Sequence, residues 1–501
     1  MRIGIRMCAR RLSCVQSFAT AALGLMILFL SVTPSANALP AFARKYGLRC
    51  SACHETWPIL NNFGLKFRDN GYQLMNDHDA PIWQNPSYWP VTFRITPIWH
   101  RVSSLNAVDT YTGVTTTLPE GTLAVQRVTS TGFDLSGLDF HTGGTLEKNI
   151  SFYVLPSSDS TATFHFETVM ARFDNLFGSS WLNIKMGRFE LNNLLSEKRM
   201  VQLTGNGGIY QTYHFIPVGD GNIFGQMGSN QLGMEYMGHS YDDRTRVSAA
   251  LLTSSDGNEN LITGANSYNG FFTFDQGIDM GKLGVDRLGA YAFVGEAATY
   301  YRTSSGTPIA GSGIQNKGFS REGFTGQFYF GPHFDVNFVT QHGADNAWFG
   351  QGYGNPINPG SAENGIPGCP PTCLPNSTPG TTLPIGSQAP TWNGYTLEAR
   401  YVYSPQLIFI GEYEAERMSR QANGPNYVAG FTGPNGLTGP SPSNLGNINN
   451  YDVLIRYNPF MTSRAGMALQ SEFNVFHQIG TGPVGTNTNT SELLLGLDFD
   501  F

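Results

Sequence analysis

From Val91 onward, apolar and polar residues alternate with a period of two. In Leu493–Phe501 the odd positions carry leucine or phenylalanine, and glycine and aspartate appear among the even positions. The segments Tyr395–Tyr403, Leu407–Ala415 and Tyr451–Tyr457 alternate in the same way. One apolar face and one mostly polar face predict β-strands whose two sides meet different surroundings.

The connections between these strands alternate between short and long. Short turns are predicted at Tyr241-Asp242-Asp243, Gly331-Pro332, Ser404-Pro405 and Asn458-Pro459. Long stretches rich in Gly, Pro, Asn and Thr lie at 255–266, 302–318, 343–392, 418–449 and 478–490. We count about sixteen strands, and an even number would leave both ends of an outer-membrane barrel in the periplasm.

Composition favours a membrane β-barrel over a soluble secreted β-sandwich or propeller. Only 13% of the residues are charged, against about a quarter in ordinary soluble domains, and 59 are glycine. A sandwich would bury its apolar face and need no terminal aromatic residue. Here an alternating strand ends on Phe501, an ending that resembles the signal for outer-membrane barrel assembly.

Residues 1–38 have the pattern of a secretory signal peptide. Four arginines precede an apolar run from Phe18 to Val32, and Ala36-Asn37-Ala38 supplies a cleavage site. An uncleaved anchor is the alternative, but the apolar run is short for a transmembrane helix. Without these residues the net charge changes from −7 to −11, with 26 basic against 37 acidic residues, which argues against a nucleic-acid partner.

Residues 39–90 read as helical. A short helix is predicted from Pro40 to His54, and a second follows Trp57-Pro58, with apolar or small residues spaced by three and four up to Leu74. About fifty residues bury little core alone, and a haem would supply an apolar centre. The predicted division is therefore 1–38 signal peptide, 39–90 monohaem cytochrome c domain and 91–501 barrel.

Cys50-Ser51-Ala52-Cys53-His54 is a Cys-x-x-Cys-His motif. Its two thiols can add to the vinyl groups of one haem, and the histidine that follows becomes the proximal iron ligand. A thioredoxin-like redox pair would need a βαβ context, and a zinc site would need two further ligands nearby. We therefore predict one covalently bound haem c.

The second axial ligand stays open. Met75 is the first candidate, His78 and His100 are alternatives, and an open or water-bound position is a further one. Haem propionates could pair with one or two members of a basic group, which comprises Arg44, Lys45, Arg49, Lys66 and Arg68. Cys369 and Cys373, in a proline-rich stretch, are expected to form a loop disulfide.

Charged residues also fall on the predicted inner face of the barrel. Most of these should line water; they include Glu398, Glu412, Glu414, Glu472, Arg400 and Arg456. Residues 189–228, with Glu190, Glu197, Lys198 and Arg199, could fold inward as a constriction loop. Acids at the outer mouth could attract a cation such as Fe²⁺, because carboxylates are hard oxygen donors.

Leu39–His54 and Pro58–Tyr72 resemble the haem domain of the fused outer-membrane porin–cytochrome c family, which includes the bacterial outer-membrane Fe(II) oxidases. The resemblance implies haem attachment at Cys50 and Cys53, with His54 as proximal ligand. It also implies a haem domain that plugs the barrel from the periplasmic side. The residues at Arg44–Gly47 differ from those of the iron oxidases, which indicates a broader branch of the family and leaves the electron donor open.

Two functions from different classes follow. The first is an outer-membrane electron relay between an extracellular donor, Fe(II) above all, and a periplasmic carrier such as a cytochrome c. If it counts as an enzyme, it is an Fe(II)-oxidising oxidoreductase. The alternative is a solute porin whose haem head is structural or senses redox state, and a surface redox sensor or adhesin is a third hypothesis.

Overall fold

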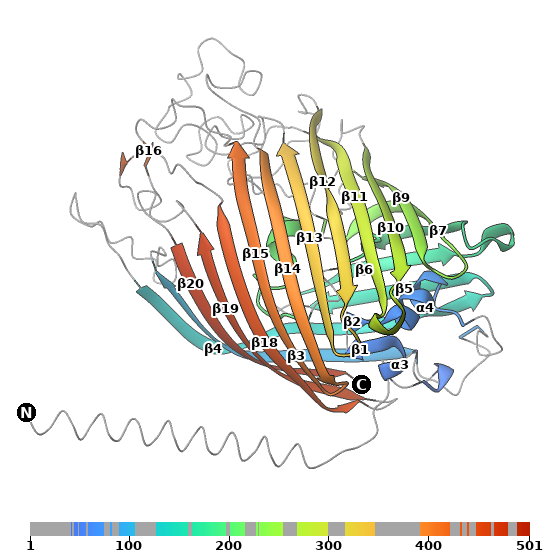
Figure 1. Cartoon of the computed structure of the whole chain (residues 1–501), viewed down its shortest axis with the longest axis horizontal. Coiled ribbons are helices and arrows are strands. Elements are labelled where there is room, and N and C mark those ends of the chain that lie inside the picture. The colour runs from blue at the N-terminus through green and yellow to red at the C-terminus, as the bar shows by residue number, and fades with distance from the viewer. Residues whose placement is uncertain are drawn as a thin grey trace, which may run out of the picture.

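Sixteen antiparallel strands close into one barrel in the computed structural model (Figure 1). The barrel strands follow the chain in order, and β20 closes the cylinder by pairing with β3, for example through Leu493 and Arg101. The prediction of about sixteen strands is confirmed, and the sandwich and propeller alternatives are wrong. The structure describes residues 42, 45–48, 50–56, 59–74, 81–82, 90–105, 127–158, 163–196, 201–215, 227–228, 230–253, 268–298, 316–345, 391–420, 431–432, 438–439, 447–461, 465–478 and 488–500.

The barrel strands range from seven to twenty-one residues. They are β3 Val91–Leu105, β4 Arg127–Glu147, β5 Ile150–Ser158, β6 Phe164–Phe173, β7 Asn183–Phe189, β8 Gln231–His239, β9 Thr245–Thr253, β10 Tyr268–Asp279, β11 Val285–Ala298, β12 Asn316–Tyr329, β13 Phe334–Asp345, β14 Thr391–Ser404, β15 Leu407–Arg420, β18 Ile448–Met461, β19 Gly466–Gln478 and β20 Thr488–Asp500. A two-stranded hairpin of β16 Phe431–Thr432 and β17 Thr438–Gly439 lies outside the cylinder.

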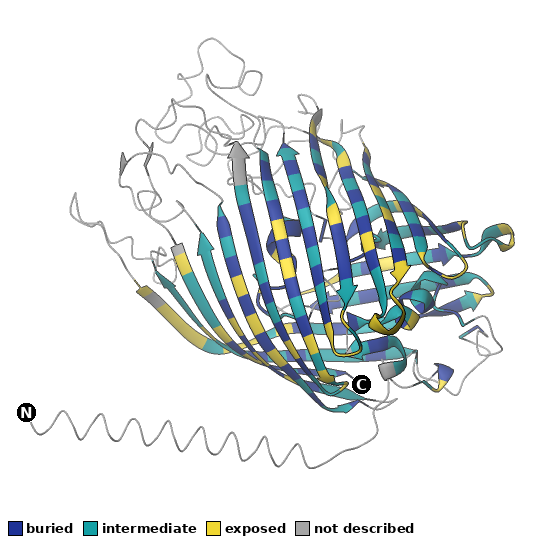
Figure 2. Ribbon diagram, in the orientation of Figure 1, coloured by how far each residue is buried: buried dark blue, intermediate teal, exposed yellow. Residues whose placement is uncertain are grey.

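The period-two pattern becomes an apolar outside and a polar inside. On β14, Leu397 is 51% exposed on the outer surface, whereas its neighbours Thr396 and Glu398 are buried in the interior. Buried and exposed positions alternate along the strands in Figure 2. A closed sheet satisfies its backbone hydrogen bonds internally, so an apolar outer face can meet lipid. The chain therefore has the construction of an outer-membrane β-barrel.

Short and long connections alternate, as the sequence predicts. The turns after β8, β12 and β14 are only a few residues long, whereas β13 and β14 are separated by residues 346–390. One predicted turn is misplaced. Asn458-Pro459 lies within β18, where the pairing with β19 shifts register between Tyr457 and Phe460. A β-bulge accommodates proline, which cannot donate to the ladder.

The connection between β7 and β8 folds into the barrel, as predicted for a constriction loop. We call its described residues between Glu190 and Phe215 the inner segment; it contains the short helix α5, Tyr210–His214. One side of it packs in a hydrophobic cluster with the walls of β9 to β13. That cluster includes Leu191, Leu194, Leu195, Ile209, Tyr213, Leu252, Phe271, Phe293 and Phe319.

The other side of the inner segment binds acids on β14, β19 and β20. Glu472 accepts backbone hydrogen bonds from Leu203 at 2.8 Å and Thr204 at 3.0 Å. Gln202 donates to Glu398 at 3.1 Å, and the Thr204 hydroxyl donates to Glu492 at 2.9 Å. The segment thus bridges two walls of the barrel and narrows its lumen.

Among the described residues, no helix is long and apolar enough to cross a membrane. The signal peptide, Met75, His78, Glu197, Lys198, Arg199, Cys369, Cys373 and Phe501 lie outside the described residues, as do Arg44 and Arg49. The expectations attached to them stay predictions.

Because the outer face meets lipid, the destabilisation caused by a charged residue there should depend on its depth in the bilayer. Leu397→Arg, at the middle of β14, should destabilise the barrel by about 2–4 kcal/mol, because the guanidinium would enter the centre of the bilayer. Tyr403→Arg, on the same face next to the turn, should cost only about 0–1 kcal/mol. Urea unfolding in liposomes measures both. Equal costs would contradict a membrane-spanning β14.

Candidate functional site

The Cys-x-x-Cys-His motif lies at the short-turn end of the barrel, in a small folded unit that we call the head and that comprises the described residues between 42 and 74 (Figure 1). One helical turn, α3 (Cys50–Cys53), leads into β1 (His54–Thr56), which pairs with β2 (Ile59–Leu60). The helix α4 follows at Asn62–Asp69. The single helix predicted from Pro40 to His54 is therefore wrong: Gly47, with a φ of 64°, and Leu48 are not helical, and His54 is already in a strand.

A close approach of two helices fixes the motif. Asn61 caps α4 by accepting from the Gly64 amide at 2.9 Å, and its side-chain amide donates to the Ala52 carbonyl at 3.1 Å. A Cβ at Gly64 would lie 2.1 Å from the Cys53 carbonyl oxygen. Only glycine lets α4 lie this close to α3, so Gly64 holds the motif in place.

The barrel wall caps the other end of α4. Arg172 of β6 donates to the carbonyl oxygens of Arg68 at 2.6 Å and Asp69 at 3.0 Å, and binds Asp174 at 2.7 Å. A cation at a helix C-terminus meets unsatisfied carbonyls and the negative end of the helix dipole. The helix stops here, earlier than predicted, because Gly71 and Tyr72 have φ angles of 72° and 62°.

A second arginine holds the last residue of α4. Arg246 of β9 lies 3.1 Å from the Asp69 carboxylate, and Arg68 lies 2.6 Å from it. Burial would raise the pKa of Asp69, but the Arg246 and Arg68 guanidiniums outweigh that effect and hold the pKa well below its usual range. Asp69 is therefore ionised, and the end of α4 is docked by charge as well as by hydrogen bonds.

Further contacts join the head to other strands. Lys45 donates to Thr145 of β4 at 2.7 Å, and Tyr329 of β12 donates to Glu55 at 2.7 Å. Arg400 of β14 lies 3.8 Å from the Glu55 carboxylate. The head is thus attached around the mouth of the barrel and has a fixed orientation in it.

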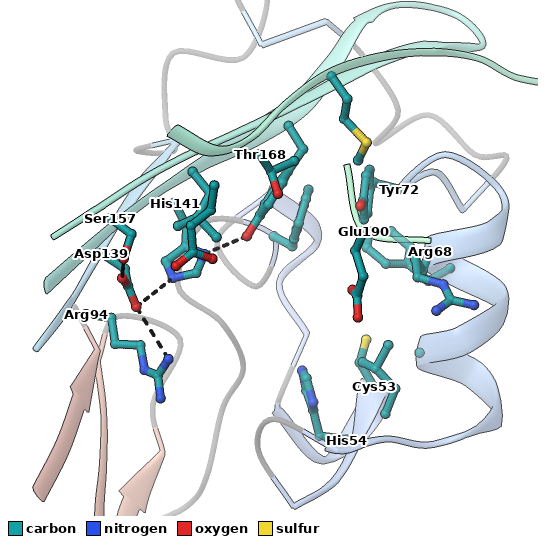
Figure 3. A pocket seen from close by; sticks show the side chains of 18 of the residues that line it. Cys53, His54, Arg68, Tyr72, Arg94, Asp139, His141, Ser157, Thr168 and Glu190 are labelled. Atoms are coloured by element: carbon teal, nitrogen blue, oxygen red, sulfur yellow. Dashed lines mark hydrogen bonds and ion pairs between the residues drawn. The ribbon is translucent and has the colours of Figure 1, made fainter. Parts of the chain in front are cut away.

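A cavity of about 480 Å³ lies between the head and the barrel wall (Figure 3). Cys53 and His54 line it from the head, and Arg94, Asp139 and His141 line it from strands β3 and β4. An aromatic group completes the lining, consisting of Phe42, Tyr46, Phe67, Tyr72 and Tyr153. The rings of this group stack or meet edge to face; Phe42 and Tyr72, for example, stack at a centroid distance of 5.0 Å.

The described residues fit a haem c. The volume is in the range of ligand pockets, and aromatic and aliphatic walls suit a porphyrin. Positions 50 and 53 are three apart in one helical turn, the spacing that two thioether bonds require. Glu190 also projects into the cavity beside Cys53 (Figure 3), so this flexible side chain would have to turn aside for a bound haem.

The alternative chemistries are less well supported. Burial raises the pKa of the Cys53 thiol to about 11, so the thiol is protonated at neutral pH and a poor redox nucleophile. A zinc site would need several ligands together, and the described part of the chain holds no group of three His, Cys, Asp or Glu residues with metal-binding geometry. Haem attachment remains the reading that the donor set suits best.

Basic side chains around the cavity could receive propionates. Of the five predicted from sequence, Arg68 lines the cavity, and its buried Nη1 has no hydrogen-bond partner among the described residues. Lys45 binds Thr145, and Lys66 binds the Tyr241 carbonyl at 3.2 Å. Arg94, Arg172 and Lys185 line the cavity from the wall, and sequence reasoning missed all three.

The histidines are distributed differently from the expectation. His100 of β3 lies 3.1 Å from Glu492 and is not among the residues that line the cavity. His141 of β4 does line it, together with His54. Sequence alone could not single out His141, because its nearness to His54 depends on the docking of the head against β4.

Comparisons with known proteins concern only the barrel. No protein-family model and no curated protein matches the chain. Solved structures that resemble it include the outer membrane channel DcaP of Acinetobacter baumannii (10% identity, TM-score 0.42, 82% of this chain and 97% of that one). Others are OprB of Pseudomonas putida (11%, 0.43, 82% and 94%) and an anion-selective porin from Comamonas acidovorans (10%, 0.43, 82% and 99%). At this distance they assign no function to the chain.

Because Arg172 docks the end of α4, replacing it should lower the stability of the protein strongly. Arg172→Ala should destabilise the protein by about 3–5 kcal/mol, because Asp174 and the end of α4 lose a buried partner. Arg244→Ala removes two ion pairs, with Asp242 and Asp279, at a side chain that is 45% exposed and should cost at most about 1 kcal/mol. Urea unfolding and protease cleavage between head and barrel measure both. Similar protease resistance in the two variants would contradict this role of Arg172.

The contact at Gly64 gives a second prediction. Gly64→Ala should cost about 1–3 kcal/mol, because the new methyl group overlaps the Cys53 carbonyl and must push the two helices apart. Gly132→Ala on β4 is the control, since a Cβ there meets nothing within 4 Å. Thermal unfolding compares the two, and an unchanged midpoint for Gly64→Ala would refute the close packing.

Proposed function

We propose that this chain is an outer-membrane electron-transfer protein that carries one c-type haem at the periplasmic mouth of its barrel. The observation that supports it best is the cavity of about 480 Å³ that Cys53 and His54 share with the wall. A solute porin has no need for this motif, nor for an aromatic chamber beside it.

The chain's own residues have separate tasks in this proposal. Cys50 and Cys53 would attach the haem and His54 would bind its iron, while Arg68, whose Nη1 has no hydrogen-bond partner among the described residues, would pair with a propionate. A haem held there supplies a one-electron Fe(III)/Fe(II) couple. The aromatic lining excludes water, which together with the axial ligands sets the potential.

The two sides of the head suit two different partners. Towards the lumen, an acidic inner wall can concentrate a cationic donor such as Fe(II). Its buried members are Glu398, Glu412, Glu414, Glu416, Asp452 and Glu472, and Glu492, which binds Thr204, adds to them. Towards the short turns, a second cavity of about 580 Å³ reaches His54 between the head and the β10–β11, β12–β13 and β14–β15 turns. A periplasmic electron carrier could approach His54 from that side.

A second candidate is an outer-membrane solute porin with a structural or redox-sensing haem head. The closed sixteen-stranded barrel with a polar inner face favours it. The inner segment argues against free diffusion, because it is bonded to Glu472 and Glu492 on one wall and packed on the opposite wall.

Anaerobic mixing of the purified protein with Fe(II) distinguishes the two. The relay predicts covalent haem and a shift to the reduced haem spectrum, lost in His54→Ala, with little solute flux through liposomes. His100→Ala is the matched control, because this histidine lies outside the cavity. Solute flux that survives in His54→Ala, with no reduction of the wild type by Fe(II), would instead establish the porin.

A further inference from the structure

We propose that His141 of the barrel wall is the second axial ligand of the haem iron, opposite His54. This inference rests on the proposed function, because it requires a haem in the cavity. It adds that the iron is bound by two parts of the fold, the head and the membrane-spanning wall.

The placement of the two imidazoles supports this assignment. His54 lies on β1 of the head and His141 on β4, and both line the same cavity (Figure 3). The His141 side chain is 17% exposed, so it is mostly withdrawn from solvent. Attachment through the Cys-x-x-Cys-His motif brings a haem to this cavity, and an imidazole on the facing wall is then a ready iron ligand.

A neighbouring tyrosine orients the His141 ring. Nδ1 lies 2.5 Å from the Tyr153 hydroxyl, and Tyr153 stacks on Tyr72 of the head at a centroid distance of 6.2 Å. Metal-binding histidines commonly donate their second N–H to an oxygen, which fixes the ring and leaves the other nitrogen for the metal. In the proposed state Nδ1–H donates to Tyr153, and Nε2 binds the iron.

Asp139 is the competing partner of Nε2. Its Oδ2 lies 3.9 Å from that nitrogen, which is an ion-pair distance rather than a hydrogen bond. The same carboxylate accepts from Ser157 at 2.5 Å and from Arg94 at 3.4 Å. Asp139 therefore keeps its bond from Ser157 and its contact with Arg94, which it shares with Asp498 at 2.9 Å, when the imidazole turns to the iron.

Two thioethers in the cavity are alternative ligands. Met170 packs against the hydrophobic cluster of the inner segment, and Met237 is buried with an exposure of 8%. Neither side chain has a polar group that orients it, whereas His141 does. Two imidazole ligands would give a lower reduction potential than a histidine with a methionine.

The test uses the full-length holoprotein and distinguishes loss of the axial ligand from loss of the haem. Haem that stays bound after denaturation reports covalent attachment, and ferric optical and electron paramagnetic resonance spectra report the ligands. We expect a low-spin bis-imidazole spectrum for the wild type and for the controls Met170→Leu and His100→Ala. His141→Ala should keep its covalent haem but become high-spin, and added imidazole should restore the low-spin spectrum.

His141→Met is the second variant, in case the alanine variant fails to fold. It should remain low-spin, acquire the charge-transfer band of thioether-bound ferric haem, and have a raised potential. An unchanged low-spin spectrum in His141→Ala, or its loss in Met170→Leu, would overturn the assignment and leave the haem protein intact. A wild type without covalent haem would overturn both this inference and the proposed function.

Discussion

The docking of α4 against the barrel wall is the interaction on which the site depends. Arg172 binds the final carbonyls of this helix, and Arg246 binds the Asp69 carboxylate beside them. With its end fixed, α4 can press Gly64 against the Cys53 carbonyl and hold the haem motif towards the wall. Neither the head nor the wall encloses the cavity alone. A small head that could bury little core by itself gains its rigidity from the barrel.

The inner segment is held in the lumen by two kinds of contact. The inner segment is packed on one wall through apolar side chains and bonded to carboxylates on the other through Leu203 and Thr204. Both basic and acidic side chains line the cavity, among them Arg94, Arg172, Asp139 and Glu190, whereas acids such as Glu412, Glu414 and Glu472 lie on the inner wall further along the strands. The acids of the inner wall would favour a cation in the barrel.

Much of the fold follows from local sequence. Period-two alternation identifies the strands because successive side chains of a barrel strand face lipid and lumen in turn. The short turns follow from the residues that form them. Asn458-Pro459 misleads because a bulge can absorb a proline within a strand. The site is harder: the motif names Cys53 and His54, but Arg172 and His141 reach it only through barrel closure and docking. Their distance along the chain from the motif leaves no local signal.

A density map of the purified protein in lipid nanodiscs would show whether the Cys-x-x-Cys-His motif holds a haem between the head and the wall. We expect a planar density in the cavity lined by His54 and Arg94, joined to the sulfurs of Cys50 and Cys53. A cavity filled only by the side chains of Glu190 and its neighbours, with two free cysteines, would contradict it.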